Sequence, residues 1–520
     1  MFSAGLLCSV LLAAAGGAIE ADAVIQEVTI HDGSGAAAVT GDIAVRGERI
    51  VALGRFSVAG TPRRIDGRGL VAAPGFIDLH THSDSAITRN TTRLNRNYLT
   101  QGVTTVVTGN CGGGRLDVAR YLAEIDQAGA GTNVAHLIPH GTLRGKVMGG
   151  EKRPPTADEL ARMKESVEQL MREGAWGMST GLIYVPSCFA ETAELVELSR
   201  AVARHGGLYV SHIRNEGNRL LEAIEEALAI GRQAGVPVHI SHLKASGGRR
   251  AWELAPAAIQ LIQKARAAGQ AVTADQYPYI ASSTSLEAML IPEEYRGAKR
   301  LAQALQDPAS AEKLRRELAQ RLADRNGGKS MVIASYAKDR SWQGKDLAWL
   351  AEKTGKSAVD LVLAIQKNGG ASMISFGMRE EDVRSFMQQA FVATASDGGA
   401  REPDNTLPHP RSYGCFPRKV GRYALENQVI PLEHAIRSAS GLPADIFGFP
   451  ERGYLRVGYF ADILVFDPRT FRDTATFDKP HQYATGVRYL WVNGKLAIDD
   501  GRVTGTLAGR ALRHRGRSSS

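Results

Sequence analysis

Apolar positions in the middle of the chain alternate between short continuous runs and helical spacing. The run GLYVSHIR ends close to His212, and apolar residues then recur three or four positions apart between Leu220 and Gly231. The run VPVHISHL follows and ends close to His242. An apolar run, an amphipathic stretch and a second apolar run are typical of two parallel strands joined by a crossover helix. One strand-helix-strand unit is therefore predicted here.

The same unit recurs between Phe76 and Gly398. Eight runs fit parallel strands: GFIDLHTH, GVTTVVTGNC, NVAHLIPHG, GAWGMSTG, GLYVSHIR, VPVHISHL, AVTADQYPY and AFVATASDG. Eight parallel strands close a barrel, so we predict an α/β fold with a TIM-like (β/α)8 barrel over residues 74–446. The gap between the seventh and eighth runs is far longer than the others. We expect an inserted subdomain there, at about residues 285–345.

The two ends of the chain share a different pattern. Residues 24–73 and 447–508 alternate short Val- and Ile-rich runs with turns, as in GDIAVRGERIVALG and GYFADILVFDP. This pattern is typical of antiparallel strands, and we expect both ends to build one small β-sandwich. Residues 509–520 carry four arginines and no acidic residue. They are expected to form a flexible basic tail.

The first residues form an apolar leader, MFSAGLLCSVLLAAAGGA, followed by the small-residue pattern Ala21-Asp22-Ala23. The leader is too short for a confident membrane span and resembles a secretory signal peptide. We therefore expect residues 1–23 to be a signal peptide and the protein to be periplasmic or secreted. No Lys or Arg precedes the apolar core, so a cytoplasmic protein is the alternative.

Composition narrows the class of protein. With 43% hydrophobic and 22% charged residues the chain is typical of a soluble enzyme. The net charge is +9, but Lys and Arg are scattered among acidic residues. They form no continuous basic surface in the sequence pattern of the kind that binds nucleic acid. The expected partner is a small molecule. Four cysteines are too few and too dispersed for a disulfide framework, so at least one needs another explanation.

Polar side chains follow the predicted strands where each one ends. They are His80, His82, Cys111, His140, His212, His242, Asp275 and Asp397. In this kind of barrel the carboxyl ends of the strands build the active site, and imidazole, thiolate and carboxylate are ligands that zinc prefers. Each residue taken alone has a structural explanation as well, such as packing for a cysteine or a helix cap for an aspartate.

The setting of each residue favours a metal site. His80 and His82 alternate along a strand and point to the same face. Cys111 lies in TGNCGG, where glycines leave little bulk to bury a structural thiol, so a metal-stabilised thiolate is favoured. Together with His212 and His242 it leaves a fourth tetrahedral position open, as in catalytic zinc sites. Asp397, in ASDGG, is suited to accept a proton from water and return it to a leaving nitrogen.

These motifs resemble those of the N-acyl-D-amino-acid deacylases, a branch of the amidohydrolase superfamily. The segments PGFIDLHTHSD, QGVTTVVTGNCG, HGTLR, SHIRNEG, VPVHISHLKASG, ASDG and HPRSYGCFPR carry the resemblance, which spans about Ala23 to Arg502. Most relatives with two metals bridge them by a carboxylated lysine from the fourth strand, whereas this branch uses a cysteine from the second. Here the fourth run, GAWGMSTG, contains no lysine and the second ends at Cys111.

The resemblance implies a role for each residue. Cys111, His212 and His242 would hold one tight zinc, His80 and His82 a weaker second metal, and Asp397 would be the general acid and base. Lys244 and Tyr277 would bind the substrate carboxylate. Arg296 is a further candidate, although its segment MLIPEEYRGAKR departs from the Leu-Pro-x-Trp pattern of the family. An acidic D-amino acid would need one more cation, for which Arg379 is a candidate.

The implied reaction is hydrolysis of an N-acyl-D-amino acid to a carboxylate and a free D-amino acid. A cyclic-amide hydrolase or a dipeptidase on the same barrel is the first alternative, which a lysine on the fourth strand would have favoured. The second alternative is a noncatalytic scaffold that binds protein partners. Such a scaffold need not keep metal ligands, and this chain keeps the whole set.

Overall fold

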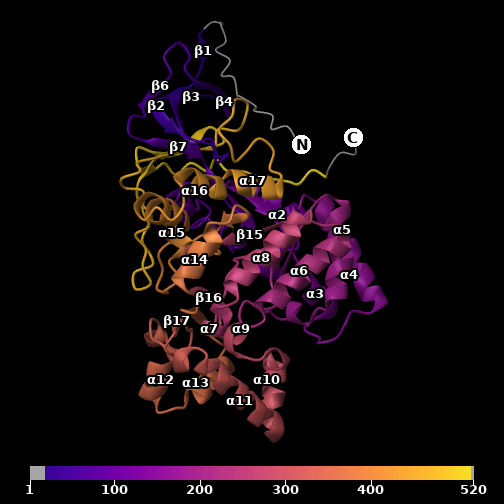
Figure 1. Ribbon diagram of the computed structural model, residues 1–520. Helices are drawn as coiled ribbons and strands as arrows, with labels where there is room; N and C mark the ends of the chain where they lie inside the picture. Colours follow the sequence, from indigo (N-terminus) through magenta and orange to yellow (C-terminus); the bar gives the residue numbers. More distant parts are fainter. Residues whose placement is uncertain (1–17, 517–520) are drawn as a thin grey trace.

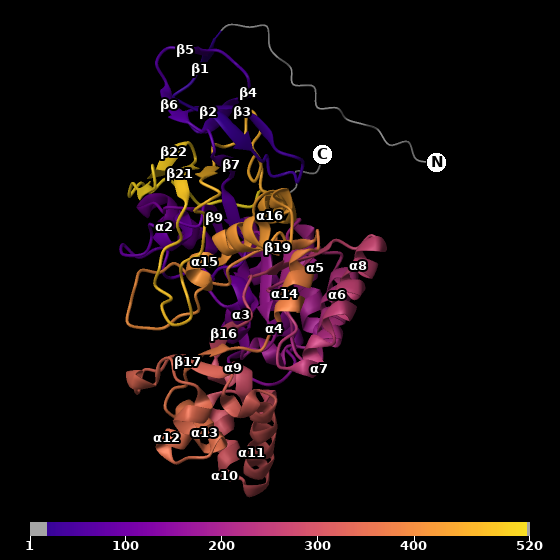
Figure 2. The same cartoon turned by 60° about the vertical axis from the view of Figure 1, so that its left-hand side comes forward.

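The structure, a computed structural model, describes residues 18–516, so most of the predicted signal peptide lies outside the described residues. Three regions follow one another along the molecule: a β-sheet region, a central region of strands surrounded by helices, and a mainly helical region at the far end (Figures 1 and 2). Within residues 18–516 we find no helix that combines the length and the apolarity needed to cross a bilayer.

The central region is built on parallel strands. In chain order they are β8 (Phe76–Asp78), β9 (Val103–Thr108), β10 (Asn133–His136), β11 (Ile138–Pro139), β12 (Gly177–Gly181), β13 (Leu208–His212), β14 (Val238–Ile240), β15 (Val272–Gln276) and β19 (Val392–Thr394). Each of the eight predicted runs contains one of these strands, and the third contains both β10 and β11. Neighbours pair in the orders β8-β9-β10 and β11-β12-β13-β14-β15-β19. A parallel bridge between Thr81 and Gly398 joins the segment after β19 to the segment after β8.

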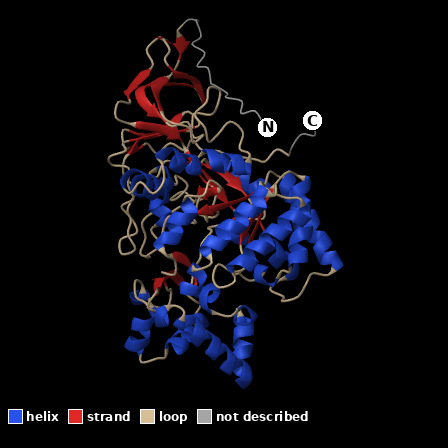
Figure 3. Ribbon diagram, viewed as in Figure 1, coloured by secondary structure: helices blue, strands red, loops and turns tan. Residues whose placement is uncertain are grey.

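Helices surround these strands (Figure 3). They include α2 (Val118–Ala128), α3 (His140–Met148), α4 (Ala157–Arg172), α5 (Thr192–Arg204), α6 (Leu220–Ala234), α8 (Ala255–Ala267), α14 (Glu380–Met387) and α16 (Leu432–Ala439). The predicted crossover helix is α6, which ends where Gly235 adopts a left-handed conformation. The start of α4 is fixed by a capping box between Thr156 and Glu159.

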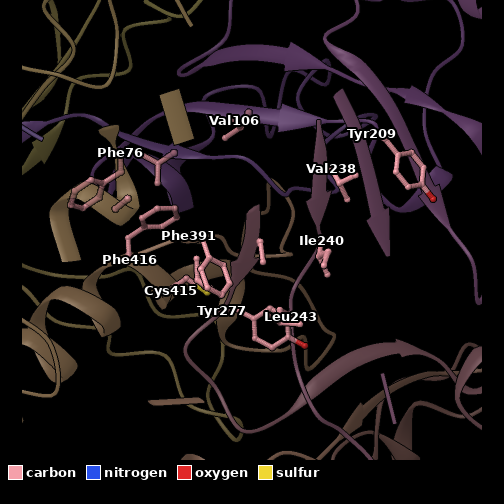
Figure 4. Close-up of a cluster of buried hydrophobic side chains, with 14 of the residues drawn as sticks. Phe76, Val106, Tyr209, Val238, Ile240, Leu243, Tyr277, Phe391, Cys415 and Phe416 are labelled. Atoms are coloured by element: carbon pink, nitrogen blue, oxygen red, sulfur yellow. The ribbon is translucent and has the colours of Figure 1, made fainter. Parts of the chain in front are cut away.

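Apolar side chains fill the space between the strands and the helices. Phe76 on β8 stacks on Phe416, with ring centroids 5.5 Å apart. Val238 and Ile240 on β14 are 2% and 0% exposed. Figure 4 shows this cluster, which also contains Cys415 and Tyr277. Burial of such side chains contributes about 1.5–3 kcal/mol each and fixes the strand ends that carry the polar residues.

Both ends of the chain enter one sheet. Its strands are β2 (Ala23–Ile30), β3 (Val39–Arg46), β4 (Arg49–Gly54), β6 (Arg63–Asp66), β7 (Val71–Pro74), β20 (Ile463–Phe466), β21 (Val487–Val492), β22 (Lys495–Asp499) and β23 (Arg502–Val503). β20 pairs antiparallel with β7, which joins the carboxyl-terminal strands to the amino-terminal ones. Ahead of them, β1 (Ile19–Glu20) pairs with β5 (Val58–Ala59), so the end of the predicted signal peptide is part of this region.

The insertion between β15 and β19 has its own hydrophobic core, which runs from Leu286 to Met373. It contains α9 (Leu286–Leu290), α10 (Ala298–Gln306), α11 (Pro308–Ala323), α12 (Leu347–Thr354) and α13 (Ala358–Lys367), with strands β16 (Ser282–Ser285), β17 (Met331–Ser335) and β18 (Ser372–Ser375). The predicted end near residue 345 is too early. The reason is that β18 lies between β16 and β17 in an antiparallel sheet, which closes the insertion only at residue 375.

Part of the predicted flexible tail is packed. Gly509 and Ala511 form bridges with Ala130 and Val134. Arg510 pairs with Glu48, and Arg513 pairs with Asp126 at 2.7 Å. These two arginines therefore have acidic partners far away in the sequence, which local composition does not reveal. Residues 517–520 lie outside the described part of the chain.

Candidate metal centre and active site

The predicted site residues converge at the carboxyl ends of the parallel strands. His80 and His82 follow β8, Cys111 follows β9, His212 ends β13, His242 and Lys244 follow β14, Tyr277 follows β15, and Asp397 follows β19. A cavity of about 1130 Å³ opens there and is lined by His212, His242, Lys244, Tyr277, Arg296 and Asp397. A second hollow of about 530 Å³ reaches Cys111, His82 and Asp397.

Cys111 lies at the centre of this group. Its Sγ is 3.3 Å from Nε2 of His80, and 3.6 Å from both Nδ1 of His212 and Nε2 of His242. For zinc–sulfur and zinc–nitrogen bonds of about 2.3 and 2.0 Å, a tetrahedral site places sulfur and nitrogen roughly 3.5 Å apart. The spacing around Cys111 therefore fits shared coordination of one ion.

A tight turn presents the Cys111 thiol. Cys111 itself has a left-handed backbone, with φ 52° and ψ 30°. Gly112 follows, also with positive φ, and a Cβ there would lie 2.9 Å from the backbone nitrogen of Gly181. Only glycine allows this close approach to β12. The glycines that pointed to Cys111 in the sequence thus have a steric role.

Potential ligand atoms form three overlapping groups. His80, Cys111 and His242 make up one, and His80, His82 and Asp397 a second. The third contains His212, His242 and Glu216. The set predicted for the tight site, Cys111 with His212 and His242, does not coincide with any one of these groups. His212 nevertheless directs Nδ1 at Cys111, while its Nε2 lies 3.8 Å from Glu216.

Two carboxylates orient the histidines, those of the buried Asp275 and the half-buried Glu216. Asp275 on β15 lies 3.4 Å from Nδ1 of His80 and accepts a hydrogen bond from the backbone nitrogen of His242 at 2.7 Å. With its Nδ1 protonated toward Asp275, His80 turns an unprotonated Nε2 toward Cys111, as metal-binding histidines do. Nδ1 of His242 lies 2.8 Å from Glu216 and also 2.8 Å from Nζ of Lys244, while Nε2 of the ring faces Cys111. Sequence reasoning assigned no role to Glu216, although it lies in the SHIRNEG motif.

Burial sets the charge state of the donors. It lowers the pKa of His80 and holds the pKa of His212 well below its usual value. Neutral imidazole is the form that binds metals. Burial also raises the pKa of the Cys111 thiol well above its usual value. A bound cation reverses that preference, because coordination deprotonates a thiol.

Neighbouring positive and hydrogen-bonding groups stabilise the charge of the Asp397 carboxylate. Its Oδ1 is 2.9 Å from Nε2 of His82, and its Oδ2 is 2.8 Å from Nη1 of Arg411. Burial works to raise the pKa of Asp397, but Arg411, His80 and His82 outweigh burial and hold the pKa well below its usual range. Arg411, buried in the HPRSYG motif, was not singled out from the sequence.

The predicted substrate-binding residues line the same cavity in different ways. Lys244 donates from Nζ to Glu216 at 2.5 Å. The Tyr277 hydroxyl is buried and has no hydrogen-bond partner among residues 18–516. Arg296 donates to three backbone carbonyls, those of Ile291, Ile183 and Ala288. Arg379 does not line this cavity and pairs with Asp382 at 2.6 Å, so its charge is already matched.

A buried polar cluster supports the turn that carries Cys111. Nδ1 of His140 is 2.9 Å from the hydroxyl of Ser187, and Nε2 is 3.0 Å from Glu194. Arg144 donates to the same carboxylate at 3.1 Å. Ser187 lies against Gly112, because a Cβ on that glycine would be 3.2 Å from the hydroxyl oxygen. This cluster gives the His and Arg of the HGTLR motif a structural role.

Known proteins are similar to this chain in sequence and in fold. Residues 63–498 match the profile described as Amidohydrolase family. The chain belongs to the amidohydrolase family. It is 38% identical to the D-aminoacylase of Alcaligenes xylosoxydans xylosoxydans, over 94% of this chain and 97% of that enzyme. It is 35% identical to the N-acyl-D-glutamate deacylase of the same organism, over 91% and 93%. The resemblance drawn from the motifs is thus confirmed.

A solved structure extends the comparison. The N-acyl-D-glutamate deacylase from Bordetella Bronchiseptica, complexed with zinc and a phosphonate inhibitor that mimics the tetrahedral intermediate of the reaction, superimposes with a TM-score of 0.81. It is 33% identical to this amidohydrolase, and the match covers 95% of this chain and all of the other. Metal binding is therefore a property of a close structural relative with the same overall fold.

Proposed function

We propose that this amidohydrolase cleaves N-acyl-D-amino acids to a carboxylate and a free D-amino acid, with zinc as its metal. The observation that carries the proposal is the position of Cys111, whose sulfur lies within 3.6 Å of three histidine nitrogens at the mouth of the parallel strands. The two relatives above, a D-aminoacylase and an N-acyl-D-glutamate deacylase, support the substrate class.

The donor set fits a metal centre with one tight and one weaker position. Cys111, His212 and His242 would hold the tight zinc, and His80 and His82 would hold a second ion with help from Asp397. His80 faces both positions, because its Nε2 is 3.3 Å from Cys111 and 3.6 Å from Asp397. When bound, the metal supplies Lewis-acid chemistry, which draws electron density from the amide carbonyl and makes the attacking water more acidic.

Asp397 would handle the proton. Amide hydrolysis needs a base for the attacking water and then an acid for a nitrogen that leaves poorly as an anion. Asp397 is ionised, faces the histidines through Oδ1, and is held by Arg411 through Oδ2. It can therefore accept a proton on Oδ1 while Arg411 keeps the carboxylate in place.

Lys244, Tyr277 and Arg296 would receive the substrate carboxylate. Lys244 and the unpartnered hydroxyl of Tyr277 lie on the same side of the cavity, with Nζ 5.6 Å from the Tyr277 ring centroid. An ammonium group and a phenol together offer charge-assisted hydrogen bonds. Arg296 lines the cavity, but backbone carbonyls already hold its guanidinium, so its contribution would be its charge.

The domain organisation that supports this site is a (β/α)8 barrel, a β-region from both termini and an insertion. The bridge from Thr81 to Gly398 supports a closed barrel. The pairing of β7 with β20 supports a terminal region shared by both chain ends. We also retain the hypothesis of export, which amino-terminal sequencing of the protein recovered from a periplasmic fraction would test.

One experiment tests the reaction and the metal site together. Zinc-loaded enzyme is given N-acetyl and N-formyl derivatives of several amino acids in both enantiomers. We expect hydrolysis of the D-forms, and Cys111→Ala should lose both zinc and turnover, because the thiolate is one of the ligands. Cys188→Ala, at another buried cysteine, is the matched control. Stoichiometric zinc and full activity in Cys111→Ala would show that Cys111 only packs.

A further inference from the structure

The outer wall of the 1130 Å³ cavity carries three arginines, Arg296, Arg321 and Arg325. Arg321 lies in the last turn of α11, and Arg325 follows four positions later, just beyond the helix end. The insertion, which also contains Arg296, thus contributes all three cations to the cavity that also holds His212 and Lys244.

These arginines have no acidic partner. Among residues 18–516, no ion pair joins Arg296, Arg321 or Arg325 to a carboxylate, and the Arg321 side chain makes no hydrogen bond within the chain. Arg325 donates to the backbone carbonyl of Arg321 at 3.0 Å. Of the other arginines that line the cavity, Arg214 pairs with Glu226 at 2.9 Å, whereas Arg219 and Arg232 also have no ion pair among residues 18–516. Arg296, Arg321 and Arg325 therefore line the cavity without an ion pair, and Arg321 lies close to both of the others.

The three arginines lie close enough to one another to change the pKa of Arg321. Burial lowers the pKa of Arg321, and the nearby charges of Arg296 and Arg325 lower it further. Glu317 and Glu293 oppose this effect, but neither forms an ion pair with Arg321 among residues 18–516. Like charges gathered in a partly buried wall are unfavourable without a counter-ion, so an anion is the ligand that this wall fits.

The segments that carry these arginines contact residues near the metal centre from two sides. Arg296 donates to the carbonyl of Ile183 at 2.6 Å, and the next residue, Tyr184, places its ring 5.1 Å from the ring of His212. On the other side, Gly248 follows Lys244 closely in sequence, and a Cβ there would be 3.3 Å from the carbonyl of Asp324. The end of α11 therefore lies directly against the loop that carries Lys244.

We propose that Arg321 and Arg325, with Arg296 beside them, form a subsite that binds a second anionic group of the substrate. The inference rests on the proposed function, in which Lys244 and Tyr277 bind the first carboxylate, and Arg296, whose guanidinium is held by backbone carbonyls, adds its charge beside both groups. Guanidinium groups bind carboxylates through paired hydrogen bonds, and Arg321 and Arg325 are four positions apart in sequence at the end of α11. The second charge has two chemical sources: an acidic side chain of the D-amino acid, or an acyl group that ends in a carboxylate.

The test compares substrates of different charge on the double variant Arg321→Gln/Arg325→Gln. N-acetyl-D-leucine carries one carboxylate, N-acetyl-D-glutamate adds one in the side chain, and N-succinyl-D-leucine adds one in the acyl group. We expect kcat/KM to fall roughly tenfold or more for at least one of the two doubly charged substrates, and less than about twofold for N-acetyl-D-leucine. The substrate that is affected identifies the source of the second charge.

Arg316→Gln is the matched control, because Arg316 lies on α11 and pairs with Glu312 at the surface. This variant should have the same kcat/KM as the wild type for all three substrates. An equal loss on all three substrates in the double variant would overturn the proposal, and so would no loss on any of them.

A binding measurement separates this inference from the proposed function. Calorimetric titration with glutarate, which has two carboxylates, and with butyrate, which has one, needs no turnover. The double variant should bind glutarate at least fivefold more weakly than the wild type and butyrate about equally. If the wild type hydrolyses none of the N-acyl-D-amino acids, the proposed function fails while a selective loss of glutarate binding still supports the subsite. Unchanged glutarate binding would contradict it.

Discussion

Asp397 combines burial with three positive or hydrogen-bonding neighbours, an arrangement that keeps its carboxylate ionised next to the candidate metal ligands. We expect Asp397→Asn to keep zinc at the Cys111 position, because the amide has nearly the same size and still hydrogen-bonds. Turnover should fall by roughly a hundredfold or more, because an amide cannot accept the proton from water. Metal analysis and kcat on the same preparation measure both effects.

The control for that variant is Asp404→Asn, at an exposed aspartate that pairs with Arg401. It should behave as the wild type. If Asp397→Asn retained zinc and worked at a near wild-type rate, Asp397 would have no part in the proton transfer. His80 and His82 would then be the groups to test as proton donors.

Lys244 offers a second residue-scale test. Lys244→Met removes the ammonium group that we assign to the substrate carboxylate, so kcat/KM for an N-acetyl-D-amino acid should fall roughly ten- to a hundredfold. The methyl ester of the same substrate has no free carboxylate, so kcat/KM for the ester should fall much less. Because Lys244 also donates to Glu216, zinc content is measured alongside. Lys264→Met, at an exposed lysine on α8, is the control.

The variant and the wild type are compared by the ratio of free-acid to ester kcat/KM. A ratio that does not change would mean that the carboxylate binds elsewhere, and Arg296 would then be examined. A loss of zinc without a change in ratio would assign Lys244 to the support of Glu216 and His242 instead.

Sequence reasoning identified the residues that lie at strand ends and missed those that act through loops. His80, Cys111, His212, His242 and Asp397 all follow apolar runs, which made their positions visible. Glu216 and Arg411 lie in segments without such a run, and they reach the site only because the chain folds back over it. A charged residue in a loop has no periodic signal, so its partner cannot be read from local sequence.

Among secondary-structure elements, the parallel strands and α6 were predictable because their hydrophobic periods are long and regular. The end of the insertion was not. β18 has the short sequence SMIS, and its place is set by pairing with β16 and β17, which are far from it in the chain. The packed part of the tail was missed for the same reason, since Glu48 and Asp126 lie hundreds of residues before their arginine partners.

The segment Arg418–Glu426 contains a buried lysine, Lys419. Lys419 is 2% exposed, and its Nζ has no hydrogen-bond partner within residues 18–516. Burial lowers the pKa of this ammonium group from 10.5 to about 7. Between these two values the unfolded chain binds more protons than the folded one, so this residue makes stability rise with pH over that window.

Lys419→Met should remove the cost of burying this amine. At pH 7 the variant should be more stable than the wild type by a few kcal/mol, on the order expected for a buried unpaired charge, and the difference should shrink as pH approaches 10. Urea unfolding at pH 7 and pH 9.5 measures it. Lys479→Met, in an exposed loop, should leave the free energy of unfolding unchanged at both pH values. A variant less stable than the wild type at pH 7 would show that Lys419 has a favourable partner.

At the scale of the whole molecule, a buried polar network joins the terminal β-region to the central strands. Arg452 pairs with Asp462 and donates to the side chain of Asn493 at 2.8 Å. Asn493 donates in turn to the side chain of Asn133, on β10, at 2.8 Å. All four residues are 5% exposed or less. The network ties a strand of the central region to the far carboxyl-terminal part of the chain.

This junction should determine whether the two regions unfold together. Arg452→Met keeps the length of the side chain but leaves Asp462 as a buried carboxylate without its cation, which costs about 3–5 kcal/mol. We expect a lower Tm in calorimetry and a single transition that broadens or splits, because Asn493, which donates to Asn133 on β10, loses its hydrogen bond from Arg452. Arg456→Met is the matched control, since Arg456 lies four positions on and is exposed. If Arg452→Met melted like this control, apolar packing alone would hold the regions together, and the Asp462 carboxylate would have to find water or another donor.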